Sequence, residues 1–111
     1  MRKLKLKIND KDYTLEFNRD SIKWLEANGF SIEDFDKKPL TYYDLLWYGL
    51  FLANHGDVNP SLAMKLMETY GKEHKVAQVI RFAIDEYNAF MFALADINSE
   101  KSDEELEIIE A

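Results

Sequence analysis

Two short segments near the N-terminus alternate strictly between apolar and polar residues. Residues 2–8, RKLKLKI, place leucine and isoleucine on one face and lysine on the other, and residues 13–17, YTLEF, alternate in the same way. This period of two predicts β-strands, and the turn-forming NDKD at residues 9–12 predicts an antiparallel hairpin. Because a lone two-stranded hairpin is marginally stable in water, its apolar face has to pack against other elements.

Pairing Ile8 with Tyr13 across this turn sets the expected register and brings the apolar side chains of both strands onto one face. The same register places Lys5 opposite Glu16, a favourable cross-strand pair. The lysines could contact nucleic acid, but no aromatic residue lies between them on that face. We therefore expect a solvated lysine face that also protects an exposed strand edge.

Helix-capping residues divide the rest of the chain into helices. Asn18 and Asn59 are favourable N-caps, and Thr41 begins a capping box. Gly29 can adopt the left-handed conformation that ends a helix. We expect helices at about residues 19–28, 41–54, 60–70 and 73–96.

The nine-residue run LLWYGLFLA, residues 45–53, is apolar on every side of a helix. A helix of this kind lies at the centre of a fold, surrounded by other elements. Gly49 lies in its middle, and we expect a neighbouring backbone to approach closely there. Trp24, Trp47 and Tyr48 are expected to be core residues, with an aromatic anchor for a partner as the alternative.

The last expected helix has an unusually wide apolar face. Its residues from Val76 to Ile97 follow the alternating spacings of four and three that are typical of a coiled-coil seam. Phe82, Met91 and Phe92 widen the face beyond such a seam. We interpret it as a long core helix, with self-association as the alternative. Trp47, Phe82, Met91 and Phe92 are the candidate partner-binding residues.

The chain of 111 residues has a net charge of −7, and much of the acidic excess lies near the C-terminus. Residues 98–111, NSEKSDEELEIIEA, contain six acidic residues and no aromatic residue. We expect a disordered acidic tail there, because it can bury too little apolar surface to offset its ordering entropy. The fold class expected for residues 1–97 is α+β, a single domain in which the N-terminal antiparallel hairpin packs on a bundle of about four helices.

Several classes of function are disfavoured by what the sequence lacks. Without cysteine there can be no disulfide, thiolate nucleophile or zinc finger. The pairs His55 with Asp57, and Glu73 with His74, supply too few ligands for a metal site. The glycines are too far apart for a phosphate-binding loop. We therefore expect no catalytic residue, no cofactor, no metal and no small-molecule substrate.

Other features bear on the environment of the chain. The adjacent carboxylates Asp85 and Glu86 point about 100° apart on a helix, so we expect them to be solvated rather than a catalytic pair. The net negative charge disfavours nucleic-acid binding. The longest apolar run is about half of a membrane span, and no signal peptide is recognised, so we expect neither a membrane protein nor a secreted one.

The order of these features resembles the small tail assembly chaperones of long-tailed phages and prophages of Gram-positive bacteria. The resemblance covers residues 1–97, and the tail shares only its acidity. It rests on WLE at residues 24–26 with GF at 29–30, KPLT at 38–41, LL at 45–46, YG at 48–49 and FL at 51–52.

The resemblance implies a non-enzymatic protein of the host cytoplasm. Such chaperones bind the tape measure protein, keep it soluble while tail-tube subunits assemble around it, and leave before the virion is complete. The tail-tube protein is a second partner that the resemblance implies. Two alternatives are an acidic phage protein that inhibits a host nucleic-acid enzyme and an interaction module of unknown partner. The inhibitor alternative would require the acidic surface to mimic DNA, and such a mimic needs charges fixed on a rigid face, which the expected disordered tail does not supply.

Overall fold

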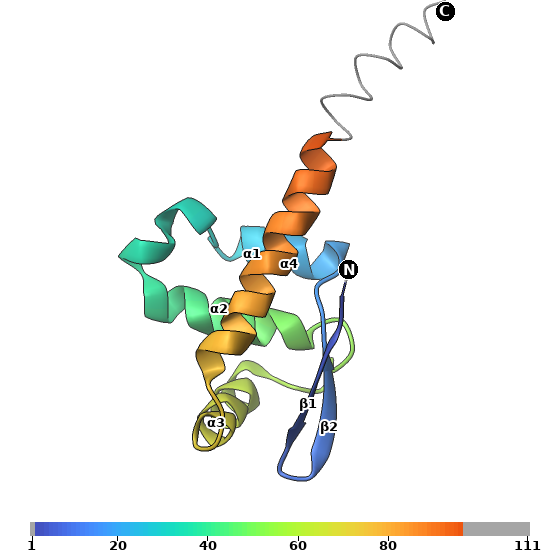
Figure 1. Cartoon of the computed structure of the whole chain (residues 1–111), viewed down its shortest axis with the longest axis vertical. Coiled ribbons are helices and arrows are strands. Elements are labelled where there is room, and N and C mark those ends of the chain that lie inside the picture. The colour runs from blue at the N-terminus through green and yellow to red at the C-terminus, as the bar shows by residue number, and fades with distance from the viewer. Residues whose placement is uncertain (1, 97–111) are drawn as a thin grey trace, which may run out of the picture.

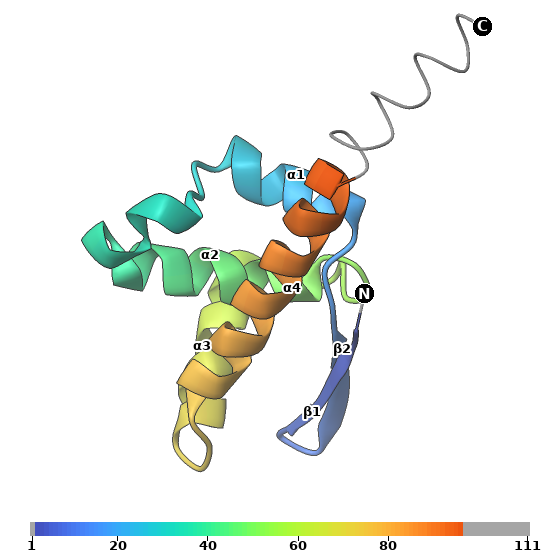
Figure 2. The same ribbon diagram turned by 45° about the horizontal axis from the view of Figure 1, so that its top comes forward.

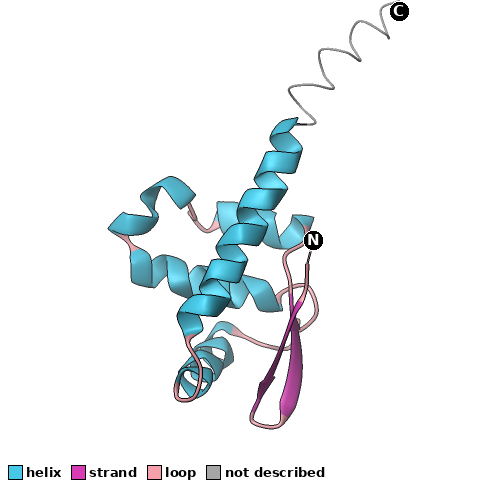
Figure 3. Ribbon diagram, in the orientation of Figure 1, coloured by secondary structure: helices cyan, strands magenta, loops and turns pink. Residues whose placement is uncertain are grey.

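The computed structural model describes residues 2–96 (Figure 1). This part of the chain is an antiparallel two-stranded hairpin followed by helices, which confirms the α+β class (Figure 3). The tail expected at residues 98–111 lies outside the described residues. The elements are β1 (Leu4–Ile8), β2 (Lys11–Leu15), α1 (Arg19–Ala27), the 3₁₀ helix η1 (Ile32–Lys37), α2 (Pro39–Phe51), α3 (Pro60–Gly71) and α4 (Val76–Asp96).

The hairpin register differs from the expected one by two residues. Ile8 lies opposite Lys11 rather than Tyr13, because the turn is formed by Asn9 and Asp10 alone. Both turn residues have positive φ angles, 54° and 63°, as a type I′ turn requires, and this turn suits the twist of the strands. A shift of two residues keeps every side chain on its expected face. Lys5 now lies opposite Thr14 instead of Glu16.

Local capping explains both ends of α1. The Asn18 side chain accepts a hydrogen bond of 2.8 Å from the Ser21 N–H, and the Ser21 hydroxyl accepts one of 2.7 Å from the Asn18 N–H. This reciprocal capping box satisfies two amide donors at the start of the helix. At the other end, Gly29 has a φ angle of 85°, and the Phe30 N–H donates to the Leu25 carbonyl at 3.0 Å. The expected glycine stop is confirmed.

Helix α2 begins earlier and ends earlier than the sequence predicts. Its first residue is Pro39, not Thr41, and its last is Phe51. Proline suits the first helical position because its fixed φ matches the helix and its missing N–H is not needed there. Lys38 is the N-cap, with φ −138° and ψ 58°, and its carbonyl accepts the Tyr42 N–H at 3.1 Å.

The start of α3 is as expected, and the start of α4 is not. The Asn59 side chain accepts a hydrogen bond of 2.8 Å from the Leu62 N–H. Helix α4 begins at Val76 instead of residue 73, because Glu73 and His74 belong to the turn that joins α3 to α4. In that turn the His74 N–H donates to the Tyr70 carbonyl at 2.9 Å.

Helix α2 is the central element, as its all-round apolar character predicts. It contacts α1, α3, α4 and β2, and α4 crosses it in both views (Figures 1 and 2). At Gly49 a Cβ atom would lie 3.3 Å from Leu25 Cδ2 and 3.5 Å from Phe17 Cε1. The expected close neighbour was a backbone, so the structure corrects this point: buried side chains occupy the space. The largest fully buried side chains include Trp47, Phe17, Phe51, Leu46 and Leu50.

Candidate partner-binding surface

Trp47 is a core residue and presents no surface to a partner in this structure. Its side chain is completely buried, and its Nε1–H donates to the Ala63 carbonyl at 2.8 Å. This hydrogen bond satisfies the indole donor inside the core and ties α2 to α3. Trp24 and Tyr48 are partly buried and pack edge to face, with ring centroids 5.2 Å apart.

Phe82 and Met91 lie on opposite sides of α4. Nine helical positions separate them, which corresponds to a rotation of about 180°. Phe82 is partly buried, and the Arg2 guanidinium carbon lies 5.5 Å from its ring centroid. Met91 instead lies on the side of α4 that faces α1. The structure therefore does not join the candidate partner-binding residues into one patch.

The end of α4, residues 90–94, forms what we call the distal segment, and it extends past α2 (Figures 1 and 2). Phe92 is 74% exposed, whereas Phe90, Met91 and Leu94 are partly buried. Rotation by about 100° per residue spreads these side chains around more than half of the helix. A helix that is apolar on several sides is typically covered by other elements, but here one side remains open.

Two hollows border the distal segment, and Met91 contributes to both. The smaller, about 70 Å³, lies between α4 and α1, with Arg19 and Lys23 at its border. The larger, about 360 Å³, lies between α4 and the segment after α1. Methionine is flexible and polarisable, so it can adapt to different apolar contacts. The side chains lining the larger hollow are Glu26, Phe30, Ser31, Ile32, Glu33, Tyr87, Asn88 and Met91.

Glu86 is buried, which corrects the expectation of a solvated residue. Only 3% of it is exposed. One carboxylate oxygen accepts the Arg2 backbone N–H at 2.7 Å, and the other accepts the Arg2 Nε–H at the same distance. This pair holds the start of the hairpin against α4. The sequence carried one signal, because Glu86 falls on the same helical stripe as the buried Val79 and Ala83.

Both histidines have structural contacts. The His55 Nε2 atom accepts the Thr14 N–H at 2.9 Å, and its ring lies 5.1 Å from the Tyr13 ring. The His74 ring stacks on Tyr70 at 4.7 Å. In the described range 2–96, no three side chains of metal-ligating type come together. None of the helices in that range is long and apolar enough to cross a membrane.

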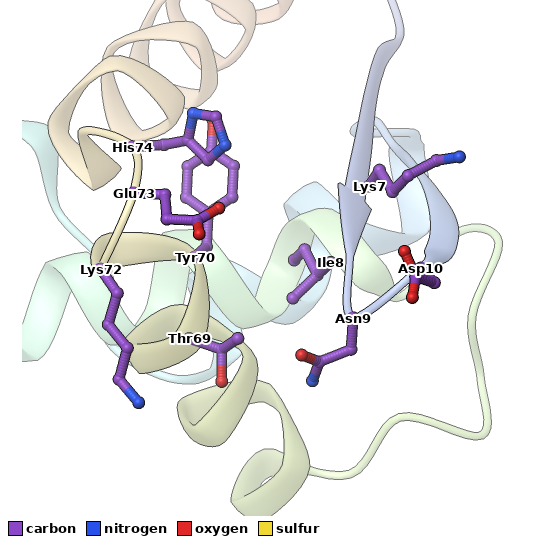
Figure 4. A pocket seen from close by; sticks show the side chains of 9 residues that line it. All are labelled: Lys7, Ile8, Asn9, Asp10, Thr69, Tyr70, Lys72, Glu73 and His74. Carbon is purple, nitrogen blue, oxygen red and sulfur yellow. The ribbon is translucent and has the colours of Figure 1, made fainter.

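A hollow of about 610 Å³ lies between the hairpin turn and the α3–α4 connection (Figure 4). Tyr70 and His74 form one wall, and Ile8 and Asn9 lie across from them. Its charged residues carry both signs, and Lys7 and Lys72 point away from each other (Figure 4). The hollow therefore lacks the convergent polar groups that usually orient a small ligand.

The fold and this surface define a small α+β domain in which a hairpin is attached to α4 and the distal end of α4 is open. A family model described as a domain of unknown function (DUF5055) matches residues 1–108, and the chain belongs to that family. No curated protein and no solved structure matches the chain.

Proposed function

We propose that this chain is a tail assembly chaperone that binds the tape measure protein of a long-tailed phage or prophage and keeps it soluble. The proposal joins the resemblance in residues 24–52 to one observation: the distal segment of α4 is apolar, protrudes and remains partly uncovered, with Phe92 74% exposed. On this proposal the protein acts in the host cytoplasm, releases its client to the tail-tube subunits and is absent from the finished virion.

An apolar helical client suits this surface. Such a client can dock by laying its apolar face along an exposed helix or into a hydrophobic groove. Met91 borders two neighbouring hollows beside the distal segment, so client side chains can enter next to an adaptable methionine. Arg19 and Lys23 border the hollow beside α1 and can contact carboxylates on the client.

The direct test is co-expression with the tape measure protein of the same phage or prophage. The client should aggregate alone and remain soluble with this chain. Because apolar burial supplies the attraction, the complex should survive high salt, which screens contacts between exposed charges. If the client stays insoluble beside folded wild-type protein at several salt concentrations and temperatures, the proposed function is wrong.

A further inference from the structure

The two edges of the hairpin differ sharply. The outer edge of β2 is closed by α2 and the loop after it. The Glu16 N–H donates to the Leu50 carbonyl at 3.2 Å, and the Thr14 N–H donates to His55. The Asn54 side-chain amide donates to the Thr14 carbonyl at 3.2 Å. This edge is therefore unavailable to another strand.

The outer edge of β1 is open. Since the Thr14 N–H points away from β1, the Lys5–Thr14 pair is a non-hydrogen-bonded pair of the antiparallel ladder. The Lys5 N–H and carbonyl consequently point away from β2, and Lys7 repeats this geometry two residues later. Among residues 2–96, neither Lys5 nor Lys7 has a hydrogen-bond partner for its backbone N–H. Such a row of unpaired groups is a template for an added strand.

The side chains of this strand present two chemically distinct faces. Residues 2–8 contain four basic residues and no acidic one. The lysines lie on the solvent face, where Lys5 lacks a carboxylate within 4.0 Å among the described residues. On the opposite face Leu4 and Leu6 are only partly buried. A strand that complements β1 would therefore carry acids on one face and apolar residues on the other.

The C-terminal sequence of this chain has that pattern. Residues 105–108, Glu-Leu-Glu-Ile, alternate strictly between acidic and apolar side chains, and the consecutive acids Asp103 and Glu104 come before this alternation. In a strand beside β1, Glu105 and Glu107 would lie along the lysine face. Leu106 and Ile108 would extend the apolar face of Leu4 and Leu6. Opposite charges that face each other on neighbouring strands stabilise the pairing.

We propose that residues 105–108 of this chain add to the open edge of β1 as a third strand, parallel to it. Helix α4 and strand β1 run in opposite directions in both views, so a segment returning from the end of α4 runs parallel to β1 (Figures 1 and 2). This interaction is independent of the proposed chaperone function.

The chain is long enough for this return. From Asp96 back to Glu86, which holds Arg2, the helix axis measures about 15 Å. An extended chain from Asp96 to Glu105 spans up to about 30 Å. About 15 Å of chain therefore remains for the passage from α4 to the first residues of β1.

Amide hydrogen exchange of the intact protein tests this proposal. Amides of residues 105–108 should exchange on the order of ten-fold or more slowly than in the isolated peptide. Lys5→Glu should abolish this protection, and adding Glu107→Lys should restore it. Lys65→Glu makes the same charge change at an exposed position of α3 and should leave protection unchanged. Random-coil exchange in the wild-type protein, which is what a disordered tail predicts, would overturn the proposal.

Disulfide trapping tests which chain supplies the strand. The protein has no cysteine of its own, so Lys5→Cys combined with Glu105→Cys or Glu107→Cys introduces a single possible pair. One of these combinations should oxidise to a disulfide within the monomer, because neighbouring strands bring Cβ atoms close together. Lys65→Cys with Glu107→Cys is the control that should not. Disulfides found only between two copies, or none at all, would contradict the proposal.

Discussion

Replacing Arg2 with alanine tests the attachment of the hairpin to α4. The change removes the guanidinium bond to the buried Glu86 and the contact with Phe82, but retains the backbone N–H bond. Leaving a buried carboxylate short of one partner costs about 1–3 kcal/mol. The Arg2 side chain is 67% exposed, so water can replace part of the lost bond and the lower half of this range is expected.

A double-mutant cycle isolates the coupling between the two residues. Once Glu86→Gln has removed the buried charge, Arg2→Ala should destabilise the protein less than it does alone. The assay is urea unfolding followed by the fluorescence of the tryptophans, one of which, Trp47, is fully buried. Lys37→Ala is the control, because it removes an exposed pair with Asp34 and should cost under about 1 kcal/mol. If the double variant is destabilised by the sum of the two single-variant costs, to within about 0.5 kcal/mol, the coupling between Arg2 and Glu86 is refuted.

Two further changes test the core. Gly49→Leu should lower the free energy of unfolding by about 1–3 kcal/mol, since Leu25 and Phe17 already fill the space; denaturant unfolding measures this, and a gain in stability would contradict it. Burial, with a smaller contribution from the Glu26 charge, raises the pKa of Tyr87 above its ordinary 10.0. The folded protein therefore keeps this proton to higher pH than the unfolded chain, and stability falls as the pH rises through the folded-state pKa. Unfolding measured against alkaline pH should show a smaller loss for Tyr87→Phe.

Features set by neighbouring residues were predictable from the sequence. The alternating hairpin faces, the Asn18 cap and the Gly29 stop all follow from local geometry. The register was missed because a two-residue turn at Asn9 and Asp10 depends on their positive φ angles, which the NDKD composition does not specify. The start of α2 was missed because Pro39 is favourable at a first helical position, and it took precedence over the capping box that begins later.

Features set by distant residues were harder to predict. Glu86 is buried because Arg2, 84 positions away in sequence, supplies two donors. The sequence is compatible with Trp47 as a core residue or as a partner anchor, and the hydrogen bond from its indole to the Ala63 carbonyl places it in the core. The wide face of α4 does extend beyond the buried stripe, yet Phe82 and Met91 point to opposite sides of the helix. Which side of α4 remains uncovered depends on how the other helices pack against it, and this is seen only in the three-dimensional structure.

The distal segment of α4 is the central element of the proposed chaperone function, and co-purification of the tape measure protein with tagged variants tests it most directly. Phe92→Glu places a charge on the distal segment, and Leu40→Glu places the same charge on an exposed apolar residue of α2. Because these residues are 74% and 80% exposed, both variants should fold, which circular dichroism can verify. We expect Phe92→Glu to lose the tape measure protein and Leu40→Glu to retain it. Equal retention by the two folded variants would contradict the assignment of the distal segment as the client-binding surface.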